Sequence, residues 1–290
     1  MELDKNLNIL IVGLGLMGGS YARALTSKGY KVKAIDTNQK SIDFALQNKF
    51  IIDGSSEVNT DMVSESDLII FAVYPHAFIP WIEQYKDYIK KGAIITDVTG
   101  VKSCVVYDVQ RILGDRAEFV AAHPMAGKET SGVESSDESI FENANSIVVP
   151  TDVNTFEAIE TIKAIGQTLG FARISSLPPK AHDEMIGFVS QLTHCIAVCL
   201  MTCSKSEHLV DYTGDSFRDL TRIARINENM WSELFLLNKE ALLKQMKTFM
   251  NEMENFYTLL ENEDVEKMKE KMRLSTERRE LFNKPRKGEK

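Results

Sequence analysis

The chain of 290 residues has little proline or glycine, with seven and 16 residues, and only four cysteines. This composition excludes collagen-like and low-complexity disordered chains. The first residues contain no uninterrupted apolar stretch long enough for a signal peptide, and no later uninterrupted run reaches about 18 apolar residues. We therefore expect a cytoplasmic protein that has no membrane partner.

Three of the cysteines, Cys195, Cys199 and Cys203, recur every four residues. On a helix, Cys195 and Cys203 lie about 12 Å apart, which is too far for one metal ion to hold both. A reducing cytoplasm also argues against disulfide bonds. We expect no metal site and interpret these cysteines as small, buried hydrophobic residues.

An excess of positive charge is also missing. The chain has 34 Lys and Arg against 42 Asp and Glu, so its formal net charge is -8. Such a molecule repels phosphate backbones and anionic lipids at long range, and we therefore do not expect it to bind nucleic acid. Hydrophobic residues make up 43% and charged residues 26%, which is ordinary for a globular protein, and the length accommodates two domains.

Short β-branched runs alternate with helix-like segments in the first half. The expected strands are residues 8–12, 31–36, 67–73, 93–98, 118–122 and 146–149, with a last strand within 171–176 before two prolines. Apolar runs without strict alternation are typical of strands covered on both faces, and intervening helices imply right-handed crossovers. The sequence therefore predicts a Rossmann-like α/β domain over residues 1–176, built on a doubly wound parallel sheet.

The second half follows a helical pattern. Residues 180–282 contain no proline and only Gly187 and Gly214, while apolar residues recur every three or four positions. This spacing predicts an all-α domain over residues 177–290. Its longest pattern runs over about residues 230–260, as a stripe of Met and Leu that is typical of a core or a dimer seam. Because so long a helix has little partner in a small domain, we expect a homodimer formed through the C-terminal helices.

A glycine-rich turn follows the first expected strand and opens a helix. Its three glycines permit a tight turn, close approach of backbone N–H groups to a pyrophosphate, and close packing of helix on strand. Asp36 closes the second strand, where its carboxylate accepts hydrogen bonds from ribose hydroxyls and repels a 2′-phosphate. We therefore expect NAD rather than NADP. The expected cofactor-binding residues are Gly13, Gly15, Leu16, Met17, Gly18, Asp36 and Val73.

Polar residues gather where later strands end, at residues 73–76, 97–102 and 123–129. Ligands of open α/β sheets bind at the carboxyl ends of the strands. His123 directly follows an apolar strand and precedes Pro124. A histidine there can exchange a proton near neutral pH. We expect an acid–base role for His123; the alternative is a histidine that only satisfies a loop carbonyl.

The glycine loop together with the segments DVTGVKS (97–103), HPMAGKETSGVE (123–134) and FRDLTRIA (217–224) resembles the prephenate dehydrogenase family. The resemblance covers about residues 10–260. It implies NAD-dependent oxidative decarboxylation of prephenate to 4-hydroxyphenylpyruvate, a step of tyrosine biosynthesis. The family also includes arogenate and cyclohexadienyl dehydrogenases, so arogenate is the alternative substrate.

The resemblance also implies roles for individual residues. In the family, the histidine that matches His123 accepts a hydrogen bond from the ring hydroxyl of the substrate and assists its deprotonation. Arg222 is the expected clamp on a substrate carboxylate, because a guanidinium binds a carboxylate through two parallel hydrogen bonds. A histidine matching His194 contacts the substrate. The alternative for His194 is a core histidine bonded to Asp183, which lies on the same helix face as His194.

One position departs from the family pattern. Many relatives have a serine where this chain has Gly100, and we expect Thr99 or a water molecule to take its place at the substrate. Lys102 keeps its place, with a surface lysine at a helix start as the alternative. Two other protein classes stay open. A β-hydroxyacid dehydrogenase would need a lysine in the helical domain, and none lies between residues 181 and 204; an NAD-sensing binding module would need no His123 and Arg222 pair.

Overall fold

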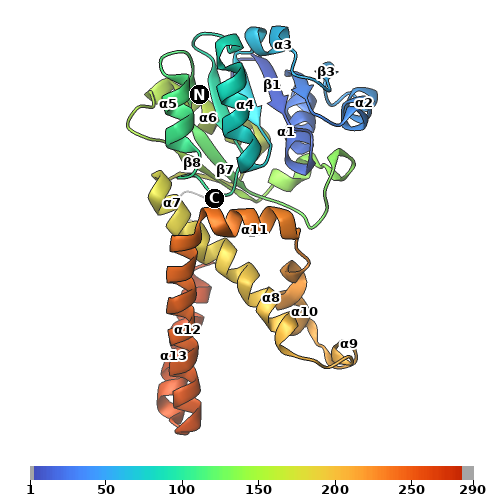
Figure 1. Cartoon of the computed structure of the whole chain (residues 1–290). Helices are drawn as coiled ribbons and strands as arrows, with labels where there is room; N and C mark the ends of the chain where they lie inside the picture. Colours follow the sequence, from blue (N-terminus) through green and yellow to red (C-terminus); the bar gives the residue numbers. More distant parts are fainter. Residues whose placement is uncertain (1–2, 283–290) are drawn as a thin grey trace. The chain divides into compact units, whose positions relative to one another are not determined.

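The computed structural model describes residues 3–282, which Figure 1 shows as a ribbon. The last residues of the expected second domain, 283–290, lie outside this range. By compactness the chain divides into one unit of residues 1–239 and another of residues 240–290. The first unit contains the sheets and all the expected site residues, so it is described first.

Six parallel strands form the main sheet, in the order β3-β2-β1-β4-β5-β6. This order reverses direction on either side of β1, so it confirms the doubly wound sheet. Strand β3 was missed from the sequence because it is short and lacks an apolar run. The strands are β1 (Asn8–Val12), β2 (Lys31–Ile35), β3 (Asp53–Ser55), β4 (Leu68–Phe71), β5 (Ile94–Asp97) and β6 (Glu118–Phe119).

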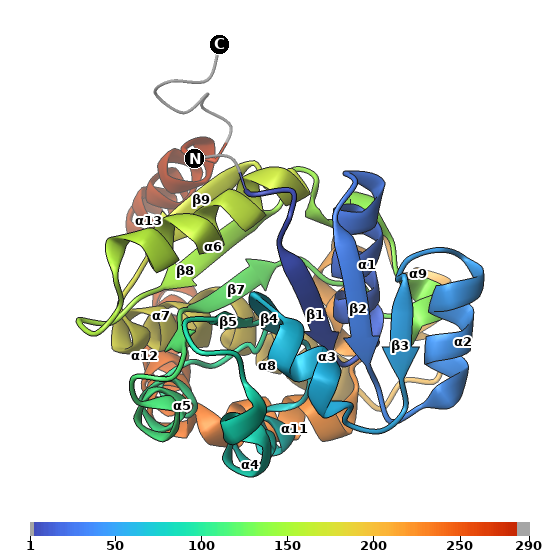
Figure 2. The same ribbon diagram turned by 90° about the horizontal axis from the view of Figure 1, so that it is seen from above.

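Helices cover both faces of this sheet, as the view from above shows (Figure 2). Alternate residues of β1 point to opposite faces. Ile9 and Ile11 pack with α1, α2 and α6, whereas Leu10 and Val12 pack with α3, α4 and α5. This two-sided burial explains the unbroken apolar runs of the central strands. The helices are α1 (Leu16–Ser27), α2 (Gln39–Gln47), α3 (Thr60–Glu65), α4 (Pro75–Tyr85), α5 (Val106–Leu113) and α6 (Phe156–Leu169).

A second, three-stranded sheet carries His123. It consists of β7 (Ala121–Met125), β8 (Asn145–Val149) and β9 (Arg173–Ser176), with β7 antiparallel and β9 parallel to β8. The single strand expected over residues 118–122 is therefore wrong. Val120 still donates to the carbonyl of Ile95, but Ala122 N–H donates to the Asp97 carboxylate instead of a strand carbonyl, so the chain leaves the parallel sheet there.

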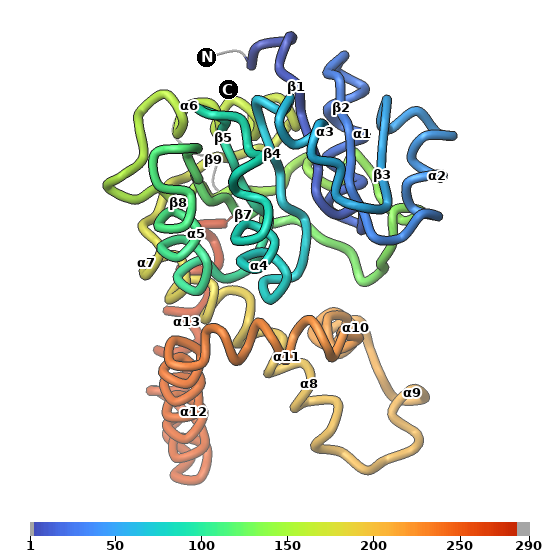
Figure 3. Tube along the Cα trace, turned by 45° about the horizontal axis from the view of Figure 1, so that its top comes forward, coloured from blue at the N-terminus to red at the C-terminus, as the bar shows by residue number. Residues whose placement is uncertain are grey.

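The helical part of the first unit begins at two prolines, whose fixed φ suits the first turn of a helix. Its path is visible in the tube view (Figure 3). A π-helical turn, η4, interrupts the regular helix; such turns are frequent at functional sites. The elements are α7 (Pro179–Ile186), η4 (Gly187–Leu192), α8 (Thr193–Cys203), α9 (Leu209–Tyr212), α10 (Asp215–Thr221), the 3₁₀ turn η5 (Arg222–Ala224) and α11 (Glu228–Leu237).

Residues Pro179–Cys203 form one continuous helix in which a window of 18 residues has a mean hydropathy of 1.6, so the helix is long and apolar enough to cross a membrane by length and composition. The helix contains no long uninterrupted apolar run, because polar residues interrupt it, but the mean hydropathy of the window stays high. Its amino-terminal half carries buried polar groups that bond to the sheet domain. Two of its cysteines, Cys199 and Cys203, are exposed and Cys195 is half-buried, so the expectation of buried cysteines is wrong for this chain.

The helix expected over residues 230–260 is broken at Asn238, which ends α11 before α12 (Lys239–Glu261) begins. The buried Asn238 amide donates to the carbonyl of Asp183 and to Gln191 Oε1. These tertiary hydrogen bonds hold Asn238 and cannot be deduced from apolar spacing.

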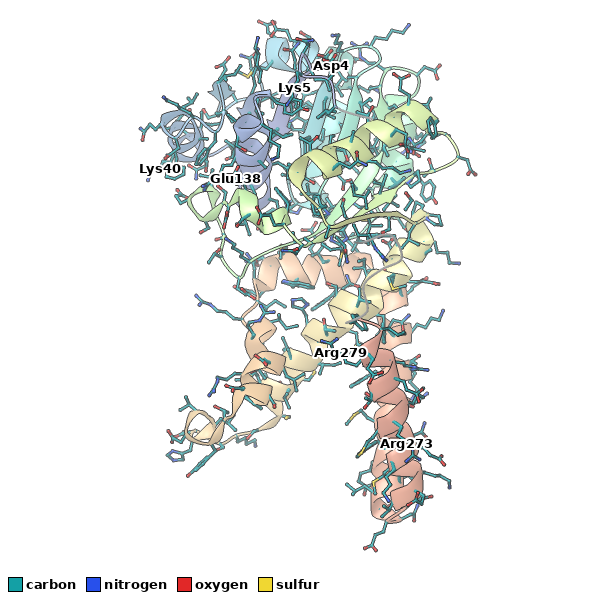
Figure 4. All side chains as sticks on the ribbon, turned by 180° about the vertical axis from the view of Figure 1, so that it is seen from behind. Asp4, Lys5, Lys40, Glu138, Arg273 and Arg279 are labelled. Carbon is teal, nitrogen blue, oxygen red and sulfur yellow. The ribbon has the colours of Figure 1, made fainter. Side chains whose placement is uncertain are left out.

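The second unit is a pair of helices, α12 and α13 (Val265–Glu280), joined by an ion pair of 2.6 Å between Lys271 and Glu252. Arg273 and Arg279 lie on α13 (Figure 4). Part of the apolar surface of α12 is not covered within this chain, since five of its side chains are more than half exposed: Leu243, Met250, Met253, Tyr257 and Leu260.

Candidate functional site

The glycine turn between β1 and α1 has the geometry that a dinucleotide needs. Gly13 has φ +98°, and a Cβ there would lie 2.5 Å from the carbonyl oxygen of Ala72. A Cβ on Gly18 would lie 1.9 Å from the carbonyl oxygen of Gly13, so helix and turn are packed too closely for any side chain. In contrast, a Cβ on Gly15 would meet no atom within 4 Å. The open space at Gly15 and the uncapped N–H groups of α1 fit a pyrophosphate.

Asp36 follows β2 and borders the same turn. One carboxylate oxygen accepts the N–H of Leu14 at 2.5 Å and the other accepts the N–H of Asn38 at 2.8 Å. Each carboxylate oxygen can accept a further hydrogen bond, and the side chain is partly exposed. The position therefore fits the hydroxyls of an adenosine ribose.

The other expected cofactor residues surround this turn. Leu16 and Met17 are the first two residues of α1. Val73 follows β4, and its Cγ1 would lie 2.9 Å from a Cβ on Gly13. The structure therefore brings all the expected cofactor residues to one edge of the sheet.

Lys102 lies in a fully buried ionic cluster beyond the carboxyl end of β5. Its ammonium donates to Asp97 at 2.7 Å and to the carbonyl of Ala122 at 2.5 Å. Burial lowers the pKa of Lys102, although the Asp97 carboxylate opposes this effect. The alternative of a surface lysine is wrong: Lys102 ties the loop after β5 to the residue before His123.

Thr99 belongs to the same cluster. Its side chain is buried, and its hydroxyl donates to Asp97 and accepts from Lys102 at 3.3 Å. The expectation that Thr99 replaces the family serine at the substrate is therefore corrected, because the hydroxyl is directed into the protein.

His123 is joined to the helical part of the unit by hydrogen bonds. Its Nδ1 lies 2.9 Å from Nε2 of His182, and Nδ1 of His182 lies 2.8 Å from an oxygen of Asp183. Asp183 also accepts the backbone N–H groups of Lys102 at 2.9 Å and Ser103 at 2.8 Å. The start of α7 is thus fixed to both strand ends that carry the site.

The surroundings keep both imidazoles neutral. Burial lowers the pKa of His123 well below 6.5, and His182 and Lys102 add to this effect. Burial also lowers the pKa of His182, although its bond to Asp183 opposes this. Burial alone would raise the pKa of Asp183, but the hydrogen bonds from His182 and Ser103 lower it overall. Near neutral pH the three groups are two neutral imidazoles and one carboxylate.

His194 and Arg222 lie together on the helical part of the unit. His194 Nδ1 lies 2.9 Å from the carbonyl oxygen of Ser190, and its ring packs against Trp231 at a tilt of 30° with centroids 3.7 Å apart. Burial lowers the pKa of His194, and the nearby Arg222 charge adds to this effect. Arg222 pairs with Glu129 from the loop after β7. The alternative of a His194 bond to Asp183 is wrong, because Asp183 bonds His182.

Helix α11 connects these groups to the sheet domain. Glu233 accepts the backbone N–H of His76 at 2.8 Å and bonds its ring at 2.9 Å. A Cβ on Gly100 would lie 3.5 Å from the Leu234 side chain and 4.0 Å from Cε1 of His123. The place of the family serine is therefore beside His123 and has room for a small side chain.

Sequence reasoning missed His182 and Glu233. His182 directly precedes Asp183, but successive helix residues are about 100° apart, so His182 falls outside the helix face shared by Asp183 and His194. Among residues 3–282, no group of three or more His, Cys, Asp or Glu is placed to hold a metal ion.

Two family models match the chain. The first, described as the nucleotide-binding domain of prephenate dehydrogenase, matches residues 21–174. The second, described as the dimerization domain of prephenate dehydrogenase, matches residues 178–274.

Individual proteins give the same result. The chain is 31% identical over 269 residues to a prephenate dehydrogenase of Bacillus subtilis, covering 90% of this chain and 72% of the relative. It is 32% identical over 248 residues to one of Lactococcus lactis, covering 83% and 68%. A crystal structure of prephenate dehydrogenase from A. aeolicus, in complex with hydroxyphenyl propionate and NAD+, matches with a TM-score of 0.86 and 30% identity, covering 97% of this chain and 98% of that one.

Proposed function

The chain belongs to the prephenate dehydrogenase family, and we propose that it converts prephenate to 4-hydroxyphenylpyruvate. It is an NAD-dependent oxidoreductase with a Rossmann-like domain. We propose prephenate rather than arogenate as the substrate because the relatives described above are prephenate dehydrogenases. The observation that carries the proposal is the His123 ring, which is bonded through Nδ1 while no described residue bonds its Nε2.

His123 supplies the base that the reaction needs. Bound NAD supplies the hydride acceptor. As the hydride leaves the ring carbon, Nε2 of His123 accepts the proton of the ring hydroxyl, and a carbon–oxygen double bond forms. The bond from the ring to its carboxylate then breaks to release carbon dioxide, and its electron pair makes the ring aromatic. His123 returns the proton to the oxygen, so no net proton is consumed.

Cationic and polar groups position the substrate in this proposal. Arg222 has five N–H donors, and its pairing with Glu129 leaves others for a substrate carboxylate. The ring of His194 is held by Ser190 and Trp231, and it lies near the charges of Arg222 and Glu129. Both residues lie on the helical part, while the base comes from β7, so substrate binding requires both parts.

We also propose a homodimer formed through the C-terminal helices. The match to a dimerization domain supports it, as do the exposed stripe of α12 and the exposed apolar residues of the Pro179–Cys203 helix, Phe188 and Val189 among them. A cytoplasmic location stays a prediction from the sequence.

The test is an assay of NADH or NADPH formation that offers prephenate and arogenate side by side, each with NAD and with NADP. We expect the highest kcat/KM with prephenate and NAD. A preference for arogenate would make the protein an arogenate dehydrogenase. No reduction with either substrate would contradict the proposal and leave a module that only binds NAD.

A further inference from the structure

His123, His182 and Asp183 form a continuous line of hydrogen bonds, here called the His–His–Asp chain. It runs from β7 to the second turn of α7, and its two links measure 2.9 Å and 2.8 Å. His182 is fully buried, and its two ring nitrogens are both used within the chain. A histidine that merely fills space would not need both nitrogens aligned with two titratable groups.

The hydrogen bonds of the chain all run in one direction from donor to acceptor, and the Asp183 carboxylate at one end sets that direction. Ionised Asp183 can only accept, so Nδ1 of His182 carries a hydrogen. Because His182 is neutral, its Nε2 has a lone pair and must accept a hydrogen from Nδ1 of His123. Neutral His123 then has no hydrogen on Nε2. The chain therefore leaves the basic lone pair on the nitrogen that no described residue bonds.

The neighbouring charged groups have other hydrogen-bond partners, so they do not disturb the donor and acceptor order of the His–His–Asp chain. The Lys102 ammonium, the nearest cation on the loop after β5, is committed to Asp97 and to the carbonyl of Ala122. The Asp97 carboxylate accepts from Lys102, Thr99 and the N–H of Ala122. Neither group is hydrogen-bonded to an imidazole of the chain.

Asp183 is itself held rigidly. Its two oxygens accept the N–H groups of Lys102 and Ser103, and its own carbonyl accepts the Asn238 amide. The position of the carboxylate is thus set by the loop after β5 and by the end of α11.

We propose that His182 and Asp183 are positioning residues that fix the proton of His123 on Nδ1, so that Nε2 is the base. When Nε2 takes up the substrate proton, the same hydrogen bonds point the new positive charge toward the Asp183 carboxylate. This inference rests on the proposed function for its kinetic consequence, but the position of the proton is independent of the substrate.

The direct test is the tautomer of His123, read from the ring nitrogen resonances of the full-length, ¹⁵N-histidine-labelled protein without substrate. The chain has five histidines, and His123→Asn and His182→Gln identify the two signals. We expect a hydrogen on Nδ1 of His123 in the wild type. Because isolated imidazole favours a hydrogen on Nε2, we expect His182→Leu to restore that form. A wild-type His123 with its hydrogen on Nε2 would overturn the proposal, whichever substrate the enzyme uses.

Kinetics give the second readout. We expect His182→Leu to lower kcat by about 10- to 100-fold, which is the loss seen when the residue that orients a metal-bound histidine is removed, with KM for NAD unchanged. His182→Gln retains an acceptor for Nδ1 of His123 and should recover part of kcat. The matched control is His208→Leu, which removes an exposed histidine that is also paired with an aspartate. Equal kcat for His182→Leu and the wild type, or no difference between Leu and Gln at residue 182, would contradict the proposal.

If His182→Leu does not fold, the wild-type tautomer and the His182→Gln kinetics still decide. If the wild type turned over neither prephenate nor arogenate but carried a hydrogen on Nδ1 of His123, the proposed function would be refuted while the order of hydrogen bonds would stand.

Discussion

Lys102 illustrates how a charged residue becomes structural when it is buried. It is fully buried with Asp97, and its ammonium also bonds the carbonyl that precedes His123. The burial of Lys102 could not be predicted, because a lysine after DVTGV has the same local pattern whether it points outward or inward. The direction is set by the carboxylate at the end of β5 and by the path of β7.

We expect Lys102→Met to lower the free energy of unfolding by roughly 3–5 kcal/mol, because it leaves the Asp97 carboxylate buried without a cation. Chemical denaturation measures this loss. The matched control is Lys90→Met, which breaks an exposed pair with Asp67 and should cost at most about 1 kcal/mol. Similar losses in the two variants would contradict the account of the buried cluster.

The lowered pKa values of His123 and His182 predict how stability depends on pH. In the unfolded chain these histidines take up protons as the pH falls through about 6.5, whereas the folded protein keeps them neutral to lower pH. The unfolded state then binds more protons, so the free energy of unfolding should fall between about pH 7.5 and about pH 5.5. Chemical denaturation at both pH values measures this change in the free energy of unfolding. The drop should be smaller in His123→Asn, and an equal drop in both proteins would count against these shifts.

At the scale of the element, the turn between β1 and α1 was readable from the sequence because its requirements are local. A strand, three glycines and an acidic residue at the end of β2 define the dinucleotide geometry without help from distant residues. Two features of the same domain were not readable. The split of β6 from β7 depends on the Asp97 side chain, and the end of α11 depends on the partners of Asn238.

We expect Asp36→Ala to reduce the preference for NAD over NADP, measured as the ratio of the two kcat/KM values. The variant removes the negative charge that repels a 2′-phosphate. It also removes the acceptor for the N–H groups of Leu14 and Asn38, so the affinity for NAD should fall as well. An unchanged ratio would argue against the contact between Asp36 and the ribose.

The candidate site shows the same division between local and distant requirements. His123 and Arg222 could be proposed as site residues because each lies in a segment that resembles the family, and His194 because the family has a matching histidine. His182 was not found, because its role depends on the approach of α7 to β7, which are far apart in sequence. Thr99 was expected at the substrate only because it is next to Gly100. In the structure its hydroxyl donates to the buried Asp97 carboxylate, which the local sequence does not predict.

At the scale of the whole molecule, exposed apolar side chains occur on helices of both units. The exposed residues of α12 and of the Pro179–Cys203 helix support the proposed homodimer. Analytical ultracentrifugation should give a dimer for the wild type, and Met250→Glu combined with Met253→Glu should shift it toward the monomer. A wild-type monomer at micromolar concentration would contradict the proposal.

The assigned chemistry requires an imidazole from the sheet domain and a guanidinium from the helical part at one site. The structure links the sheet domain to the neighbourhood of Arg222 through α11, in which Glu233 bonds His76 and Trp231 packs against His194. The Glu129 partner of Arg222 also lies on the loop that follows His123. These contacts are the physical basis for assigning both residues to one reaction.

The most direct test of this account is the rate of NADH formation from prephenate by the wild type and by His123→Asn, with NAD affinity measured in parallel. We expect kcat to fall by roughly 10² to 10⁴, the usual contribution of a positioned base, and NAD affinity to stay the same. Turnover close to that of the wild type would remove His123 from the reaction and contradict the account.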